Sequence, residues 1–179
     1  MSKSVSTKVI VPCRFSYLHC WEPGSVNGSE PKYSVSAIIP KSDKKTIAAI
    51  NAAIDQAKKD SVSKWGGKVP ANLKLPLRDG DIDRPGDEAY KDAYFFNANS
   101  RQAPQVVDAH VQPILDQSEV YSGCYGKISV TFYGYNSNGN RGIAAGLGNI
   151  QKLRDGESLG GRSTAAEDFE TEEDDDFLS

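Results

Sequence analysis

Hydrophobic and polar residues alternate in several short segments of the chain, as they do in half-buried β-strands. The run KYSVSAIIP shows this most clearly, because Tyr33, Val35, Ala37 and Ile39 fall on one side of an extended chain. Five segments with β-branched and aromatic residues are predicted strands: 8–21, 32–40, 91–100, 118–135 and 141–153. The last two are predicted to form a hairpin through the turn NSNGN.

One segment has the periodicity of a helix. It follows Ser42, a residue type that caps helices, and its apolar residues recur at spacings of three and four: Ile47, Ile50, Ile54 and Ala57. We expect a helix over 44–65 whose apolar stripe packs against the sheet. Segment 66–90 contains seven Gly and Pro residues and is expected to be a long loop.

These elements predict a mainly β protein. Short strands, Gly- and Pro-rich turns and one substantial helix favour an OB-fold-like, five-stranded, partly open barrel, although the spacing alone also permits a sandwich. We expect one folded domain over 1–160 and a disordered acidic tail over 161–179, because the tail has too few apolar residues and too much like charge to fold.

The charge is divided unevenly along the chain. The formal net charge is -3, but eight of the 24 acidic residues lie in 167–179 and all 21 Lys and Arg residues precede them. The body therefore carries 21 basic against 16 acidic residues, a net charge of +5. Such a division is typical of proteins that bind nucleic acid. The tail could compete with the nucleic acid and offer its aromatic residues to a partner, or act as a solubilising segment.

The segment YGKISVTFYGY carries the most informative pattern. Alternation places Ile128, Val130 and Phe132 towards the core and Tyr125, Lys127, Tyr133 and Tyr135 on the other face. Aromatic rings can stack bases and a lysine can follow the phosphate backbone, so this face favours binding of single-stranded nucleic acid without sequence preference. Tyrosine is also common in ordinary strands, which weakens the signal.

Further candidates extend this face. In YFF at 94–96, either Tyr94 and Phe96 or Phe95 must face the core, and the pattern leaves both open. The predicted DNA-binding residues are Tyr125, Lys127, Tyr133, Tyr135, Tyr94, Phe96, Arg101, Tyr33, Lys41, Arg141 and Lys152. A wider set of basic residues could line the path: Arg14, Lys44, Lys45, Arg78, Arg84, Lys91 and Arg154.

No competing chemistry is well supported by the sequence, and we expect neither catalysis, a metal nor a cofactor. GxSxG, HExxH and P-loop patterns are absent, and the glycine pattern that begins at Gly146 fails at Gln151. Asp79, Asp81 and Asp83 resemble the start of a calcium loop, but its sixth position is arginine. The three cysteines are expected to be reduced thiols. A membrane span and a signal peptide are not expected, which favours the cytoplasm.

Extended runs of the sequence resemble a phage-encoded family of single-stranded DNA-binding proteins, formerly a domain of unknown function. They are YFFNANSRQAPQVVD, VYSGCYGKISVTFYGYN and GLGNIQKLRDGESLGGR. The resemblance implies an OB-fold that coats single-stranded DNA in phage replication and recombination in the host cytoplasm. It also implies an acidic C-terminus that recruits replication proteins such as a polymerase or helicase, here through Asp174, Asp175, Asp176 and Phe177. Relatives end in an aromatic residue, whereas Leu178 and Ser179 follow Phe177 here.

Two other functions stay open. A structural or virion assembly protein would use the tyrosine face as a subunit interface. A strand-annealing recombination protein would also bind single strands, and would speed the pairing of complementary ones. We expect a monomer or weak dimer.

Overall fold

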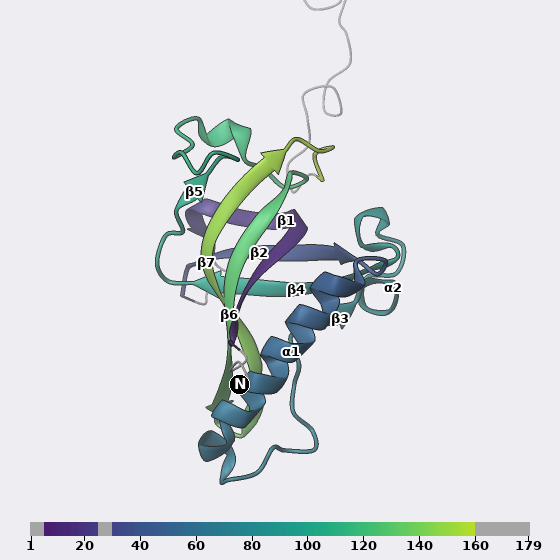
Figure 1. Ribbon diagram of the computed structural model, residues 1–179, viewed down its shortest axis with the longest axis vertical. Helices are drawn as coiled ribbons and strands as arrows, with labels where there is room; N and C mark the ends of the chain where they lie inside the picture. Colours follow the sequence, from purple (N-terminus) through teal and green to yellow (C-terminus); the bar gives the residue numbers. More distant parts are fainter. Residues whose placement is uncertain (1–5, 25–29, 160–179) are drawn as a thin grey trace, which may run out of the picture.

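The computed structural model describes residues 6–24 and 30–159 (Figure 1). Five long strands form the body of the protein: β1 (Lys8–Gly24), β2 (Lys32–Pro40), β4 (Ala93–Ser100), β6 (Tyr125–Ser137) and β7 (Asn140–Arg154). Two short strands, β3 (Arg78–Asp79) and β5 (Val106–Val107), lie at the ends of the strand order β3-β4-β2-β1-β6-β7-β5. The predicted acidic tail lies outside the described residues.

The sheet closes on itself into a barrel. β4 and β7 pair in parallel through Ala98 with Ala145 and Asn99 with Gly146, which joins the two sides of the sheet. The other contacts around the barrel are antiparallel. The prediction of a five-stranded, OB-like barrel with one substantial helix is confirmed, and this short parallel pairing makes the barrel closed.

The β6–β7 hairpin forms as the turn sequence predicts. Ser137 pairs with Asn140, which leaves Asn138 and Gly139 as a two-residue loop with φ of 51° and 86°. Positive φ at both positions is the requirement of a type I′ turn, which Asn-Gly meets at low cost. The hairpin extends well beyond the body of the barrel (Figure 1).

Helix α1 (Lys44–Asp60) runs obliquely beside the lower part of the barrel (Figure 1). It is shorter than predicted because the chain continues as a separate 3₁₀ turn, η1 (Val62–Trp65). Its cap is Asp43 instead of Ser42, since the Asp43 carboxylate accepts a hydrogen bond from the Thr46 N–H. The indole Nε1 of Trp65 donates to the Tyr135 carbonyl at 3.0 Å and fixes η1 against β6.

Apolar residues pack on both sides of β2 and β4. Inside the barrel lie fully buried side chains such as Phe15, Ile39, Phe96 and Phe132. Outside it lies a smaller cluster of buried residues, Ile38, Tyr90, Ala93 and Phe95. Segment 78–92 covers this outer cluster, and the Tyr90 hydroxyl donates to Ser36 Oγ at 2.9 Å.

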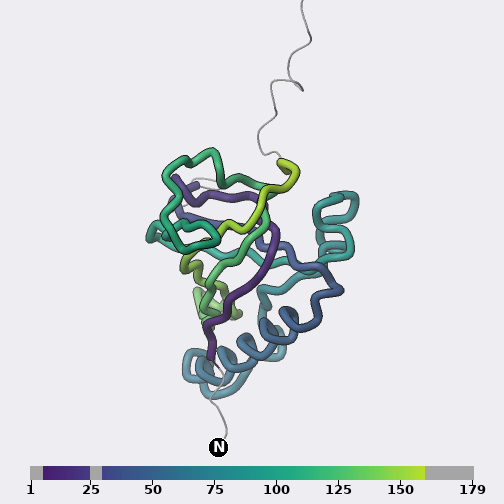
Figure 2. Tube along the Cα trace, turned by 45° about the horizontal axis from the view of Figure 1, so that its top comes forward, coloured from purple at the N-terminus to yellow at the C-terminus, as the bar shows by residue number. Residues whose placement is uncertain are grey.

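The sequence predictions for two further segments are wrong. The expected loop 66–90 contains β3, α2 (Gly80–Asp83) and η2 (Glu88–Tyr90), because Asp79 and Asp87 cap short helical turns. The strand expected to begin at 118 begins at Tyr125, after the 3₁₀ turn η3 (Gln117–Glu119). The segment between β5 and β6 lies at the end of the barrel opposite α1 (Figures 1 and 2).

The three cysteines are free and buried, as expected for thiols. Burial raises the pKa of the Cys20 thiol to about 12, so it stays protonated near neutral pH. In the described part of the chain, no group of three or more His, Cys, Asp or Glu residues is placed to hold a metal ion. Its helices are all too short or too polar to cross a membrane.

Candidate nucleic-acid interface

The outer surface of β1 and β6 presents a row of cationic, apolar and aromatic side chains. The two strands are antiparallel, and their outward positions pair Arg14 with Tyr125 and Pro12 with Lys127. Farther along, Ile10 pairs with Ser129 and Lys8 with Thr131. The positions between them, including Val11, Ile128 and Val130, are buried in the core. We call the row of eight paired outward residues the β1–β6 face.

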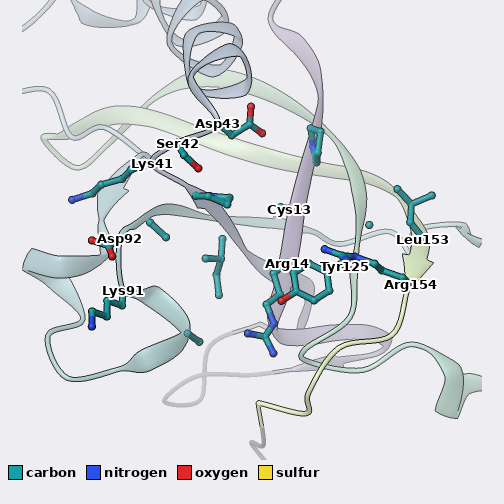
Figure 3. Close-up of a pocket in the computed structure, with 16 residues that line it drawn as sticks. Cys13, Arg14, Lys41, Ser42, Asp43, Lys91, Asp92, Tyr125, Leu153 and Arg154 are labelled. Carbon is teal, nitrogen blue, oxygen red and sulfur yellow. The ribbon is translucent and has the colours of Figure 1, made fainter.

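A groove of about 770 Å³ lies at one end of the β1–β6 face (Figure 3). Its lining is mainly apolar, and its charged residues include four cations and two aspartates. The apolar lining comes from Pro12, Ile38, Pro40, Ala89, Ala93 and Leu153, and the cations are Arg14, Lys41, Lys91 and Arg154. An apolar surface with cationic edges suits a ligand with flat apolar rings and a negative backbone.

Tyr125 stands beside two of these cations. The guanidinium carbon of Arg154 lies 4.2 Å from the centre of the Tyr125 ring, and that of Arg14 lies 5.2 Å from it. Figure 3 shows the three side chains together at the edge of the groove. Both arginines are within the range of cation–π attraction. Planar guanidinium groups and aromatic rings each stack on bases, so the cluster offers several flat surfaces close together.

Arg14 is held in place by backbone carbonyls. Its Nε donates to the Gly123 oxygen at 3.1 Å and its Nη2 donates to the Glu157 oxygen at 2.7 Å. Residues 155–159 therefore fold back along the barrel after β7 ends. Leu159 continues this path, because its N–H donates to the Ser122 carbonyl and its side chain packs on the outer cluster.

Two predicted phosphate contacts already have acidic partners. Lys41 Nζ lies 2.9 Å from Asp79 and 2.8 Å from Asp81, and hydrogen bonds to Asp81 and then Asp79 raise the pKa of the lysine. Lys152 pairs with Asp155, and only 16% of its side chain is exposed. Its ammonium lies over the Tyr121 ring instead of in the groove. Neither lysine is therefore an unpaired cation on the β1–β6 face.

The prediction that Phe96 contacts DNA is corrected by its burial. Phe96 is 0% exposed and packs edge-on against Phe132 inside the barrel, with the ring centres 5.6 Å apart. Phe95, which has the opposite orientation, is buried in the outer cluster against Tyr90. Both side chains therefore stabilise the fold. Segment 78–92 covers Phe95 on the outer side of β4, and the barrel encloses Phe96 on the inner side.

The structure brings some of the predicted residues together and separates others. Tyr125 and Lys127 are neighbours on the β1–β6 face. Tyr133 and Tyr135 lie farther along β6, beside a separate cavity of about 490 Å³ that Lys64 also lines. The exposed fraction of Tyr133 is 43%.

The remaining predicted residues are dispersed. Tyr33 pairs with Ser100 while Ile39 pairs with Tyr94, so Tyr33 and Tyr94 lie about 20 Å apart along the sheet. Arg101 follows Ser100 and forms an ion pair with Glu30. Arg141 lies next to the turn of the β6–β7 hairpin. DNA contacts by these residues stay predictions.

The wider basic set predicted from the sequence includes Arg14 and Arg154, but the sequence did not indicate that both lie beside Tyr125. The outward direction of Arg14 was predictable, because it alternates with the buried Cys13 and Phe15. The direction of Arg154 was not, because irregular pairing near the end of β7 shifts the alternation. Tyr17 was missed: a bulge in β1 gives it a φ of 46° and leaves it exposed, with Arg84 5.2 Å from its ring.

A closed five-stranded barrel with a cationic and aromatic outer face has the architecture of the small barrels that bind oligonucleotides. Comparison with known proteins specifies the class. The family described as "Enterobacter phage Enc34, ssDNA-binding protein" matches residues 5–178, and the chain belongs to this family. The resemblance seen in the sequence is thereby confirmed.

Individual relatives agree with this assignment. Protein p50 of Acyrthosiphon pisum secondary endosymbiont phage 1 is 32% identical over 169 residues, which cover 88% of this chain and 89% of the relative. The single-stranded DNA-binding protein of bacteriophage Enc34, solved in complex with single-stranded DNA, is 25% identical with a TM-score of 0.72 over 89% of this chain and 97% of that one. The single-stranded DNA-binding protein gp2.5 of bacteriophage T7 shares the fold at 15% identity, with a TM-score of 0.59 over 90% and 92% of the two chains.

Proposed function

We propose that this protein binds single-stranded DNA along the β1–β6 face, without sequence preference and without catalysis. The observation that carries the proposal is the cluster of Arg14, Tyr125 and Arg154 beside the apolar groove. Stacking on flat side chains is tolerant of sequence because every base has a π-face, and the cations attract phosphates. Membership of a family described by its single-stranded DNA binding supports the same conclusion.

The biological setting that we propose is coating and protection of single strands during phage DNA replication and recombination in the host cytoplasm. The acidic tail is proposed to compete with DNA for the cationic surface and to recruit replication proteins. The path of residues 155–159 supports this role, because the Glu157 carbonyl accepts a hydrogen bond from Arg14 of the β1–β6 face and Leu159 packs on the outer cluster. The eight acidic residues of the tail follow Leu159 closely in the chain. Their effective concentration near Arg14 and Arg154 is therefore high.

The experiment is a fluorescence-anisotropy titration of labelled poly-dT with the full-length protein at two salt concentrations, with duplex DNA as a control. We expect salt-sensitive binding that favours single strands, because phosphate neutralisation releases counterions. Arg154→Ala and Tyr125→Ala should each weaken binding, by about 5- to 150-fold for the loss of a stacked base. Tyr125→Phe should retain most of the affinity because it keeps the ring.

Lys59→Ala is the matched control for the loss of one positive charge, since Lys59 is an exposed residue in the last turn of α1. It should change the affinity little. Equal losses for Lys59→Ala and Arg154→Ala would contradict the assigned face. No binding of single strands by the intact protein would overturn the proposed function.

A further inference from the structure

A second, smaller cleft continues the β1–β6 face beyond the main groove. Its volume is about 270 Å³, and it is lined by Lys8 and Ile10 of β1, Lys127 of β6 and Val111 of the loop after β5. Pro12 lines the main groove and pairs with Lys127, so the two cavities are adjacent across this residue pair. We call the second cavity the Val111 cleft.

Two apolar side chains of the Val111 cleft are exposed to solvent. Ile10 is 55% exposed and Val111 is 67% exposed. Val111 also has a φ of 61°, in the left-handed region that β-branched residues strongly avoid. Such strain persists where the surrounding structure enforces it, and it is found preferentially at functional sites.

A network of hydrogen bonds enforces the position of Val111. Its N–H donates to the Asp108 carbonyl at 3.0 Å, and the Asp108 carboxylate accepts from the N–H groups of His110 and Gln112 at 2.8 and 3.0 Å. The Gln151 side chain donates to the Asp108 carbonyl and fastens the loop to β7. These hydrogen bonds therefore hold Val111 at the edge of the Val111 cleft with its side chain exposed to solvent.

The charges of the cleft suit an anionic ligand. Lys8 and Lys127 lie on neighbouring strands, and neither forms an ion pair with any of the described residues. Asp108, the nearby acid, directs its carboxylate to the backbone of its own loop. Apolar walls between two ammonium groups match the ring and the flanking phosphates of one nucleotide.

We propose that the Val111 cleft is a second nucleotide subsite that holds one base against Ile10 and Val111, with Lys8 and Lys127 at the adjacent phosphates. This inference rests on the proposed function, because the nucleotide belongs to the same strand that occupies the main groove. From Arg14 to Lys8, β1 spans about 20 Å, which allows a path of several nucleotides. Aliphatic walls also favour the methyl group of thymine.

The test compares Val111→Gly with wild type in full-length protein, using a short oligo-dT that fills the main groove and a longer one that reaches the cleft. Glycine removes the apolar wall and accepts positive φ, so the melting temperature should stay unchanged or rise. Affinity for the longer oligonucleotide should fall several-fold, whereas affinity for the short one should not change. Ile10→Ala should have the same length-dependent effect.

Leu115→Ala is the control, because Leu115 is a 92% exposed apolar residue of the same loop that does not line the cleft. A second measurement compares oligo-dT with oligo-dU. Wild type should prefer thymine by about 2- to 4-fold, the effect of one buried methyl group, and Val111→Gly should lose this preference.

The outcomes separate the subsite from the proposed function. If wild type binds both oligonucleotides and Arg154→Ala lowers the affinity for both, the main groove is supported as a DNA-binding site. If Val111→Gly and Ile10→Ala then bind the longer oligonucleotide as wild type does, the Val111 cleft is not a subsite. If wild type binds neither oligonucleotide, the proposed function itself fails.

Discussion

Phe95 and Phe96 show how much the role of one residue depends on what covers it. They are adjacent on β4 and point to opposite sides, and both are buried. Phe96 belongs to the interior of the barrel, whereas Phe95 meets Tyr90 at a ring-centre distance of 4.9 Å outside it. The aromatic run at 94–96 is therefore mainly a packing feature.

Phe96→Ala should lower the free energy of unfolding by about 3–5 kcal/mol, because a large aromatic side chain leaves a cavity in a closed barrel. Denaturant unfolding measures this loss, and Phe96→Leu should cost less because it fills more of the space. Folded Phe96→Ala protein should bind DNA with nearly wild-type affinity. A variant of normal stability with greatly weakened DNA binding would instead restore Phe96 as a contact residue.

Alternation along strands predicted the residues that it governs directly. Ile128, Val130 and Phe132 are buried, and Tyr125 and Lys127 lie outside, as the pattern indicates. Alternation failed where contacts outside the strand decide the position of a side chain. Segment 78–92, which directly precedes β4, folds over its outer side, and irregular pairing in β7 turns Lys152 away from the groove and brings Arg154 to it.

At the scale of elements, segment 78–92 is fastened over the barrel by charged side chains. Lys41, directly after β2, pairs with Asp79 and Asp81. The Asp81 carboxylate also accepts a hydrogen bond from the Asp92 N–H at 3.1 Å. The hydrogen bond from Lys41 and then that from Asp92 lower the pKa of Asp81. These contacts are strongest when the carboxylate is ionised.

The lowered pKa predicts acid loosening of this segment. An acid whose pKa is lower in the folded state stabilises that state above its ordinary pKa, about 3.9 for aspartate, and loses this effect as pH falls through the folded value. The Asp92 amide resonance should therefore shift as the pH drops below about 4. Asp81→Asn should abolish this shift, and a shift that persists in the variant would assign the titration to another acid.

The elements themselves were more predictable than their assembly. Asn138 and Gly139 predict the hairpin turn, and the periodic spacing of apolar residues predicts α1. The site required knowledge of strand register, because Arg14 and Tyr125 are 111 positions apart in the sequence and meet through β1–β6 pairing. Local patterns carry no information on such a partner.

The whole molecule combines a cationic body with an acidic C-terminus. A truncated protein that ends at Ala166 should bind single-stranded DNA more tightly than the full chain, and the difference should shrink with added salt. A full-length chain with its eight tail acids changed to Asn and Gln is the matched control and should behave like the truncation. If only the truncation binds more tightly, the length of the tail matters and its charge does not.

The parallel pairing of β4 with β7 also constrains when the protein can fold during synthesis. Until β6 and β7 leave the ribosome, the nascent sheet has an unpaired edge at β1 and an edge at β4 that the two-residue strand β3 pairs only in part. Such edges are prone to associate with other chains. The β6–β7 hairpin forms locally and satisfies both edges when it docks. Barrel closure is therefore a late event, and a ribosome that stalls before β7 leaves an open sheet exposed to neighbouring chains.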